Sequence, residues 1–264
     1  NKNAFIEALD TLTHRGPDSS GIWFSDSNKN ALGFKRLSII DLSSNANQPM
    51  QSSCGNYKIV FNGEIYNFVK IRNTLLNKGY EFNSTSDSEV LLNAYIEWGA
   101  RCLNKVDGMF AFAFYNKTTK KIIIARDSNG AKPVYYGINA GVFYFSSEIK
   151  SLLEVGFERK ICKEALKHYY KQGYNSGYLT LFQGIKKLVP GEVLTINVKT
   201  KEKTSINLNN KEIPRTTTSP NSRERVRELV NKAVKQTLMG RRKIGLFLSG
   251  GMDSTSILYE MLEL

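Results

Sequence analysis

The chain has 264 residues, with 37 Lys and Arg against 24 Asp and Glu, so its formal charge is +13 and its pI lies near 9.5. An apolar content of 41% is enough for a hydrophobic core, which excludes disorder over the whole chain. No apolar run approaches the roughly 20 residues that a bilayer crossing needs, so the sequence predicts no membrane span. The cations are scattered, which predicts weak, non-specific attraction to nucleic acid and no specific nucleic-acid site.

The sequence holds few residues for metal or disulfide chemistry. Its three cysteines lie far apart and form no CxxC pair: Cys54, Cys102 and Cys162. The two histidines, His14 and His168, cannot build a zinc site by themselves. Because an odd cysteine count without a signal peptide is typical of a reducing compartment, we expect a cytoplasmic protein. The chain starts at Asn1 and stops at Leu264 inside a helix-like run, so we expect a fragment of a longer protein.

The first part of the chain predicts helices separated by strands. Apolar side chains at helical spacing predict a helix over residues 5–12, which the sequence HRGPD at 14–18 terminates. Residues 31–37 and 57–62 predict strands. Asn67 is a candidate N-cap for the next amphipathic helix.

The middle of the chain predicts one helix followed by antiparallel strands. Ser86 and Glu89 form a capping box in front of an apolar helix. Residues 109–115 and 121–126 are apolar and joined by a short polar turn, so they predict a β-hairpin. Further strands are expected over residues 135–136, 142–145 and 193–198. Many antiparallel strands with few helices indicate the α+β class.

The composition changes near residue 200. Residues 199–219 are polar and rich in Asn, Lys and Thr, which indicates a linker. We therefore divide the chain into a first domain over residues 1–204, a linker over 205–221 and a truncated second domain over 222–264. The second domain opens with an amphipathic helix, for which Ser222 is a candidate cap, and continues with a buried strand over 243–248. Its length is too small for an independent parallel-sheet domain.

The expected strand leads into the sequence SGGMDS at residues 249–254 and then into a helix. Glycines let the backbone approach a ligand closely, and the N–H groups at a helix start favour an anion. The pattern therefore predicts a phosphate-binding loop, in which Asp253 orients the loop or holds Mg²⁺. The alternative is an ordinary Gly-Gly turn before a capped helix. The loop lacks the Gly-Lys-Ser/Thr of a Walker loop and resembles the pyrophosphate loop of ATP pyrophosphatases. The residues assigned to ATP or pyrophosphate are Phe247, Leu248, Ser249, Gly250, Gly251, Asp253 and Ser254.

Several other motifs share one resemblance. They are HRGPD at 14–18, RLSIID at 36–41, NGEIYN at 62–67, SDSE at 86–89, GMFAFA at 108–113, ARD at 125–127, SSEIK at 146–150 and VPG at 189–191. Together they look like the glutaminase domain of glutamine-hydrolysing asparagine synthetases. The resemblance implies an N-terminal-nucleophile fold, a four-layer αββα sandwich of antiparallel sheets, followed by the start of an α/β ATP-pyrophosphatase domain. The phosphate loop follows the glutaminase motifs, as it does in that family.

The resemblance also implies roles for individual residues. Arg36 binds the α-carboxylate of glutamine with a bidentate fork, and Asp87 binds the α-ammonium. The Asn62 side chain and the Gly63 backbone N–H form the oxyanion hole, in which one donor is typically worth roughly 3–4 kcal/mol. The pocket is completed by Leu37, Ser38, Ile39, Ile40 and Glu64. Without the family, the same residues fit a strand-end ion pair, an acid at a helix start and an Asn-Gly turn.

The nucleophile is expected outside the printed sequence. The family uses an N-terminal cysteine whose own α-amino group relays the proton, and the motif order places that cysteine before Asn1. None of the three cysteines is expected to replace it, because a reactive thiol needs an electropositive setting. His14 is expected to have a structural role beside the helix break. The 264 residues alone are therefore not expected to hydrolyse glutamine.

The resemblance implies ATP-dependent conversion of aspartate to asparagine, with glutamine as the ammonia donor. Glutamine is hydrolysed to glutamate and ammonia, and ATP with Mg²⁺ activates aspartate as β-aspartyl-AMP, giving asparagine, AMP and pyrophosphate. The alternatives are an amidotransferase of the same architecture that acts on a cell-surface sugar, a peptide or a β-lactam precursor, and a catalytically dead module. The expected partners are thus glutamine, aspartate and ATP, with no membrane and no specific nucleic acid, and the sequence leaves a homodimer open.

Overall fold

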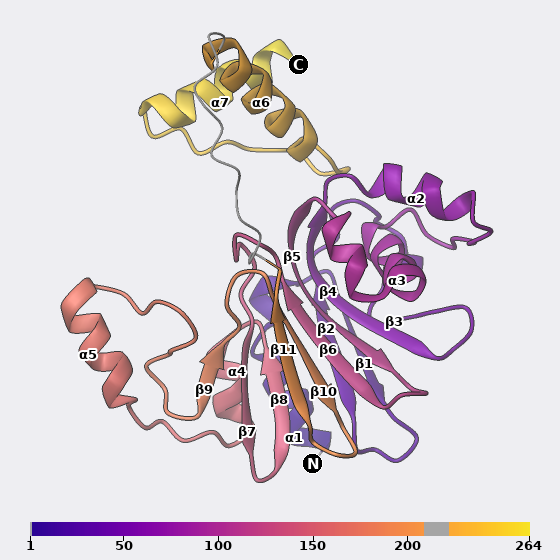
Figure 1. Cartoon of the computed structure of the whole chain (residues 1–264), viewed down its shortest axis with the longest axis vertical. Coiled ribbons are helices and arrows are strands. Elements are labelled where there is room, and N and C mark those ends of the chain that lie inside the picture. The colour runs from indigo at the N-terminus through magenta and orange to yellow at the C-terminus, as the bar shows by residue number, and fades with distance from the viewer. Residues whose placement is uncertain (1, 209–221) are drawn as a thin grey trace.

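The computed structural model describes residues 2–208 and 222–264. Residues 2–208 form two β layers with helices outside them, whereas α6 (Ser222–Thr237) and α7 (Met252–Glu263) pack against each other beyond one end of these layers (Figure 1). No helix within the described ranges is long and apolar enough to span a bilayer.

The larger β layer is a six-stranded antiparallel sheet in the order β11-β10-β6-β5-β4-β3. Its strands are β3 (Met50–Gln51), β4 (Tyr57–Ile65), β5 (Gly108–Asn116), β6 (Lys121–Arg126), β10 (Glu192–Asn197) and β11 (Lys203–Asn207). The predicted hairpin is confirmed as β5 and β6. α2 (Phe68–Leu76) and α3 (Asp87–Trp98) pack on this sheet through a core that includes Phe61, Leu91 and Phe112.

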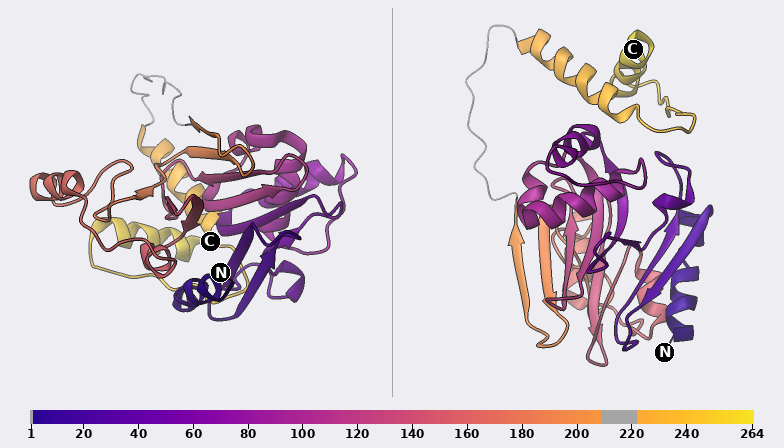
Figure 2. Two further views of the ribbon diagram at one scale, coloured as in Figure 1. Left: turned by 90° about the horizontal axis from the view of Figure 1, so that it is seen from below. Right: turned by 90° about the vertical axis from the view of Figure 1, so that its right-hand side faces the viewer.

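The second β layer consists of two smaller antiparallel sheets, β1-β2 and β8-β7-β9. Their strands are β1 (Ser19–Phe24), β2 (Ala31–Arg36), β7 (Tyr135–Asn139), β8 (Val142–Ser146) and β9 (Ile185–Lys187). Figure 2 shows β1, β2 and α1 (Lys2–Asp10) as a layer separate from the six-stranded sheet. Leu32, Val60 and Ile124 belong to the core between the two β layers.

The outer helices complete the sandwich. α1 contacts β2, α4 (Ile149–Glu154) contacts β8, and the two helices contact each other. The order of layers is therefore α2 and α3, six-stranded sheet, two small sheets, α1 and α4, which confirms the predicted α+β class and four-layer αββα sandwich. The remaining short elements are α5 (Lys163–Gln172) and the 3₁₀ turns Thr13–Arg15, Ser44–Ala46 and Gly99–Asn104.

The strands that the sequence did not predict are short or carry few buried side chains. β1 has no fully buried residue, β3 has two residues and β9 has three. β11 is mostly exposed and continues to Asn207, past the expected domain boundary at residue 204. The rest of the expected linker, residues 209–221, lies outside the described residues.

Of two expected helix caps, one lacks its predicted hydrogen bond and the other is confirmed in part. Asn67 precedes α2, but its side chain bonds to Lys105 O at 2.8 Å and to the Asp107 N–H at 3.0 Å instead of capping the helix. Ser86 Oγ accepts the Glu89 N–H at 3.3 Å, as in a capping box. The Glu89 carboxylate, however, accepts N–H groups of residues 83 and 84 instead of the Ser86 N–H.

The expected strand over residues 243–248 is not formed in the structure. These residues run without a β partner, and Phe247 is 99% exposed. A β-strand needs at least one neighbouring strand to accept and donate its backbone hydrogen bonds, and the described residues supply none here. The prediction of a helix after residue 221 and of another at the SGGMDS sequence is confirmed by α6 and α7, although α7 begins at Met252, inside that sequence and not after it.

Candidate active site

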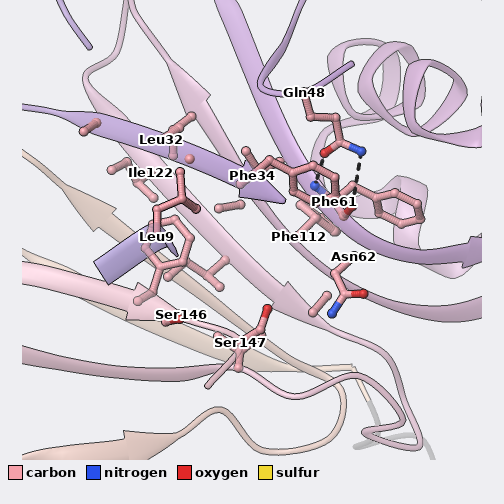
Figure 3. Close-up of a pocket in the computed structure, with 18 of the residues that line it drawn as sticks. Leu9, Leu32, Phe34, Gln48, Phe61, Asn62, Phe112, Ile122, Ser146 and Ser147 are labelled. Carbon is pink, nitrogen blue, oxygen red and sulfur yellow. Dashed lines mark hydrogen bonds between the residues drawn. The ribbon is translucent and has the colours of Figure 1, made fainter. Parts of the chain in front are cut away.

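A cavity of about 870 Å³ lies between the two β layers (Figure 3). Apolar side chains such as Leu9, Leu32 and Ile122 line one part of it, and Asn62 lies in another. Among the described residues, β2 and β8 each have one edge without a strand partner, and residues of both strands line the cavity. All nine residues that the sequence assigned to glutamine line this single cavity: Arg36, Leu37, Ser38, Ile39, Ile40, Asn62, Gly63, Glu64 and Asp87.

The two expected oxyanion donors lie next to each other on β4. The Asn62 Nδ2 atom is buried and has no hydrogen-bond partner, which is costly for a polar group unless a ligand completes it. A side chain at Gly63 would place its Cβ atom 2.2 Å from Met109 O, so only glycine fits against β5. β4 therefore presents an unused amide donor to the cavity at a position fixed by strand pairing.

Arg36, at the end of β2, is buried and anchors the loop that follows it. Its Nη1 atom donates to Ser43 O and to Asn47 Oδ1, each at 2.7 Å, and Nη2 donates to Asp41 O. Burial lowers the pKa of the Arg36 guanidinium, an effect that nearby Asp41 opposes. The cation thus lies in the cavity wall and already holds the loop in place, which was not foreseen from the sequence.

Asp41 fixes the other side of that loop. Its carboxylate accepts the Ser43 N–H at 2.8 Å and both the backbone N–H and the hydroxyl of Thr85, at 2.7 and 2.9 Å. Although burial alone would raise the pKa of Asp41, the hydrogen bonds from Ser43 and Thr85 lower it to about 2. The loop is thereby tied to the start of α3, where Asp87 lies.

Asp87 is 6% exposed, and its Oδ2 accepts the Ile65 N–H at 3.0 Å. Burial raises the pKa of this carboxyl to about 7, and the charge of Glu64 adds to the increase. Burial also raises the pKa of Glu64, which the charge of Lys132 opposes. Two desolvated carboxyls at one end of the cavity form a site that an ammonium group would stabilise.

His14 and the cysteines do not line the cavity. His14 Nε2 lies 2.9 Å from Glu148 Oε1, and this geometry fits the structural role expected for it. Burial raises the pKa of the Cys102 thiol to about 12, whereas Cys54 is exposed and a hydrogen bond with Ser52 lowers its pKa. Neither position brings a thiol to Asn62.

Sequence reasoning missed some cavity residues. Arg15, Lys132, Ser146 and Ser147 line the cavity without an assigned role. Arg15 and the two serines belong to the motifs at 14–18 and 146–150, so their place in these motifs could have identified them as cavity residues. Lys132 had no such signal, because its approach to Glu64 depends on how the loop after β6 folds back.

The expected phosphate loop is exposed and has few contacts outside itself. Ser249 Oγ and Ser254 Oγ lie 3.1 Å apart across the loop, and Gly250 has φ of +80°, which favours glycine. No side chain caps α7, so its first N–H groups face the loop without a side-chain acceptor. Among the described residues, no group of three or more His, Cys, Asp and Glu side chains could hold a metal ion, so Asp253 belongs to no such group.

Comparison with known families agrees with this geometry. Residues 1–206 match the family described as glutamine amidotransferase domain, and residues 225–263 match asparagine synthase. Asparagine synthetase [glutamine-hydrolyzing] 1 of Bacillus subtilis is 40% identical over 248 residues, which are 93% of this chain and 38% of that protein. Amidase chry2 of Gibberella zeae is 33% identical over 95% of this chain and 37% of its own length. The chain thus spans about two fifths of the length of these relatives.

Solved structures show the same fold. Glutamine phosphoribosylpyrophosphate amidotransferase from Bacillus subtilis, complexed with ADP and GMP, matches with a TM-score of 0.56 and 21% identity, over 76% of this chain and 45% of that one. A structure described as the allosteric regulatory enzyme of purine biosynthesis matches with a TM-score of 0.58 and 19% identity, over 98% of this chain and 60% of the other. Together with the motifs and the layered sandwich, these matches show that the chain belongs to the glutamine amidotransferase family, and residues 225–263 after that domain match asparagine synthase.

Proposed function

We propose that the cavity between the β layers binds glutamine. The observation that carries this proposal is the convergence of nine predicted residues on one cavity, in which the Asn62 amide is buried without a partner. Arg36 would hold the α-carboxylate, while Asp87 and Glu64 would hold the α-ammonium. The carboxamide carbon would then lie near Asn62 Nδ2 and the Gly63 N–H, which would stabilise an oxyanion.

The proposed reaction in the cavity is hydrolysis of the carboxamide. The sulfur of a thiol attacks the amide carbon while the thiol proton passes to the leaving nitrogen, so the C–N bond breaks and ammonia leaves. Water then hydrolyses the thioester to glutamate and regenerates the thiol. None of the three cysteines of this chain lines the cavity, so we assign the thiol to an N-terminal cysteine outside the printed residues.

Titration calorimetry with L-glutamine tests the cavity on the 264-residue chain. We expect saturable binding of L-glutamine and much weaker binding of its analogue without an α-amino group, because Asp87 and Glu64 would lose their cation. Equal binding of the two compounds would contradict the assignment of these carboxyls.

For the whole protein we propose glutamine-dependent asparagine synthesis. Ammonia from the first site attacks aspartate that ATP has activated as β-aspartyl-AMP, and asparagine, AMP and pyrophosphate result. The match of residues 225–263 to asparagine synthase and the similarity to three Bacillus subtilis asparagine synthetases support this proposal. Formation of asparagine and AMP from glutamine, aspartate and ATP is the expected outcome, and AMP formation that does not depend on aspartate would contradict it.

The phosphate loop would serve the nucleotide in that reaction. Ser249, Ser254 and the uncapped start of α7 offer hydroxyl and N–H donors, which suit a pyrophosphate group. Mg²⁺ would neutralise phosphate charge there, and Asp253 is the carboxylate that could contact it. Phe247 and Leu248 are exposed and would line the same nucleotide site.

A different acceptor is the second candidate. The similarity to a protein named Amidase chry2, at 33% identity over 95% of this chain, motivates this candidate, because that name does not specify aspartate as the acceptor. Both candidates share the glutamine cavity, so the dependence of AMP formation on aspartate separates them.

A further inference from the structure

The segment that leads to the phosphate loop touches the loop that lines the glutamine cavity. Between α6 and residue 249 the chain passes beside Ser38 and Ile39. The Arg241 N–H donates to Ile39 O at 2.8 Å, and Arg242 Nε donates to Ser38 O at 3.1 Å. Both acceptors are backbone carbonyls of cavity-lining residues, so the contact acts on the shape of the loop itself.

Asp18 completes this contact from the opposite side. Its Oδ2 accepts the Ser38 N–H at 2.9 Å and also lies 3.2 Å from Arg242 Nη2. The N–H and the C=O of Ser38 are therefore both held, one by Asp18 and the other by Arg242, and those two side chains form an ion pair. The Arg242 side chain, which belongs to the segment that leads to the phosphate loop, thus completes a ring of hydrogen bonds around Ser38.

The preceding residue permits this close approach. Gly240 has φ of +110°, a conformation that favours glycine. A Cβ atom at this position would lie 2.9 Å from Ile39 Cγ2 and 3.2 Å from Ile39 O. The chain therefore contacts the loop closely at three successive residues, from 240 to 242.

We infer that Arg242 is a positioning residue for the glutamine site, acting through Ser38 and Ile39 from the segment that carries the phosphate loop. The inference rests on the proposed glutamine cavity. It assigns a role to Asp18, the last residue of the HRGPD motif, which the glutamine contacts leave unexplained. It also implies that displacement of residues 240–242 changes the loop over Ser38 and Ile39, and hence the affinity for glutamine.

The test compares Arg242→Ala with Lys243→Ala in the 264-residue chain, because both remove one cation from neighbouring positions. We expect Arg242→Ala to raise the Kd for L-glutamine about tenfold, a coupling of ordinary size, and Lys243→Ala to leave it unchanged. Arg242→Lys keeps the charge beside Asp18 but lacks the Nε donor, so an intermediate Kd is expected. The thermal unfolding midpoint should stay constant, since the Arg242 side chain is 56% exposed and its ion pair with Asp18 adds little stability.

Amide hydrogen exchange over residues 38–41 provides a second readout that does not need glutamine. Faster exchange in Arg242→Ala than in Lys243→Ala is expected, and identical exchange and identical Kd values in the two variants would overturn the inference. Failure of the unsubstituted chain to bind glutamine would instead contradict the proposed function. The exchange comparison would then still decide whether Arg242 holds the loop.

Discussion

The proposed glutamine cavity and the proposed phosphate loop differ in how their residues are held. In the cavity, Arg36 and Asp87 are less than 10% exposed and are fixed by hydrogen bonds to backbone groups of other elements. In the phosphate loop, Ser249 and Ser254 are bonded mainly to their own loop, and Phe247 before it is 99% exposed. The first site is formed by packing within this chain, whereas the second has its local loop geometry but no surrounding strands among the residues that the structure describes. Changes to cavity side chains that hold such hydrogen bonds should therefore affect folding as well as binding, and changes in the phosphate loop should affect binding alone.

The largest expected effect concerns the pH dependence of stability at Asp87. Its pKa is about 7 in the folded protein against 3.8 for the ordinary group, so the folded state holds the extra proton between these values. Stability therefore falls as pH rises from about 4 to about 7, by at most about 4 kcal/mol. Asp87→Asn should remove that loss, so its free energy of unfolding relative to the unsubstituted chain should increase over this range. Denaturant unfolding at pH 4 and pH 8 measures the difference.

Glu64→Gln serves as the comparison for that experiment. Burial also raises the pKa of Glu64, so its variant should show the same sign of pH dependence. Parallel stability curves for Asp87→Asn and the unsubstituted chain would show that Asp87 is not desolvated, and the contrast between the two sites would then be wrong.

The next effect is on glutamine affinity. Asp87→Ala should weaken L-glutamine binding at least about 100-fold, equivalent to about 2.7 kcal/mol, because the ammonium loses its buried anion. Calorimetry above pH 7 is the suitable measurement, since Asp87 is then charged. Asp253→Ala lies in the phosphate loop and should leave glutamine affinity unchanged. A similar loss in both variants would point to a general disturbance of the chain.

A smaller effect separates two buried amides of the cavity. Gln48 Oε1 accepts the Phe61 N–H at 2.6 Å and its Nε2 donates to Phe61 O at 3.2 Å, whereas Asn62 Nδ2 has no partner (Figure 3). Gln48→Ala should reduce the free energy of unfolding by about 2 kcal/mol, because two buried backbone groups lose their partners. Asn62→Ala should change it by less than about 0.5 kcal/mol while weakening glutamine binding. Equal destabilisation by Gln48→Ala and Asn62→Ala would show that the Asn62 side chain stabilises the fold as Gln48 does.

The smallest effect is expected in the phosphate loop. Ser249→Ala removes an exposed hydroxyl whose contacts stay within the loop, so the free energy of unfolding should change by less than about 0.5 kcal/mol. Denaturant unfolding beside Gln48→Ala measures this contrast. A loss as large as that of Gln48→Ala would show that the loop is packed as firmly as the cavity.

The sequence predicted the secondary-structure elements that carry a clear run of apolar side chains. The apolar runs at 109–115 and 121–126 became β5 and β6, but β1 and β11 carry no fully buried residue and left no such pattern. The strand expected at 243–248 depends on neighbours that the described residues do not supply. The local sequence pattern therefore gave wrong predictions where the presence or absence of a pairing strand decides whether a strand forms.

The candidate site was likewise predicted only in part. Motif resemblance selected nine residues that line one cavity, although they come from segments as distant as Arg36 and Asp87. It did not predict that Arg36 would hold the following loop, nor that Arg242 would bond to Ser38, because both contacts depend on how loops fold back. Hydrogen bonds between residues far apart in the chain produce no periodic pattern in the sequence.

Nuclear magnetic resonance of the side-chain amides tests the central claim most directly. Titration with L-glutamine should shift the Asn62 Nδ2 signals and the Gly63 N–H and leave the Gln48 Nε2 signals almost unchanged, because Gln48 is already bonded to Phe61. Saturation of the Asn62 shift at the calorimetric Kd would support an amide donor that awaits glutamine. Absence of any Asn62 shift at saturating L-glutamine would contradict the account.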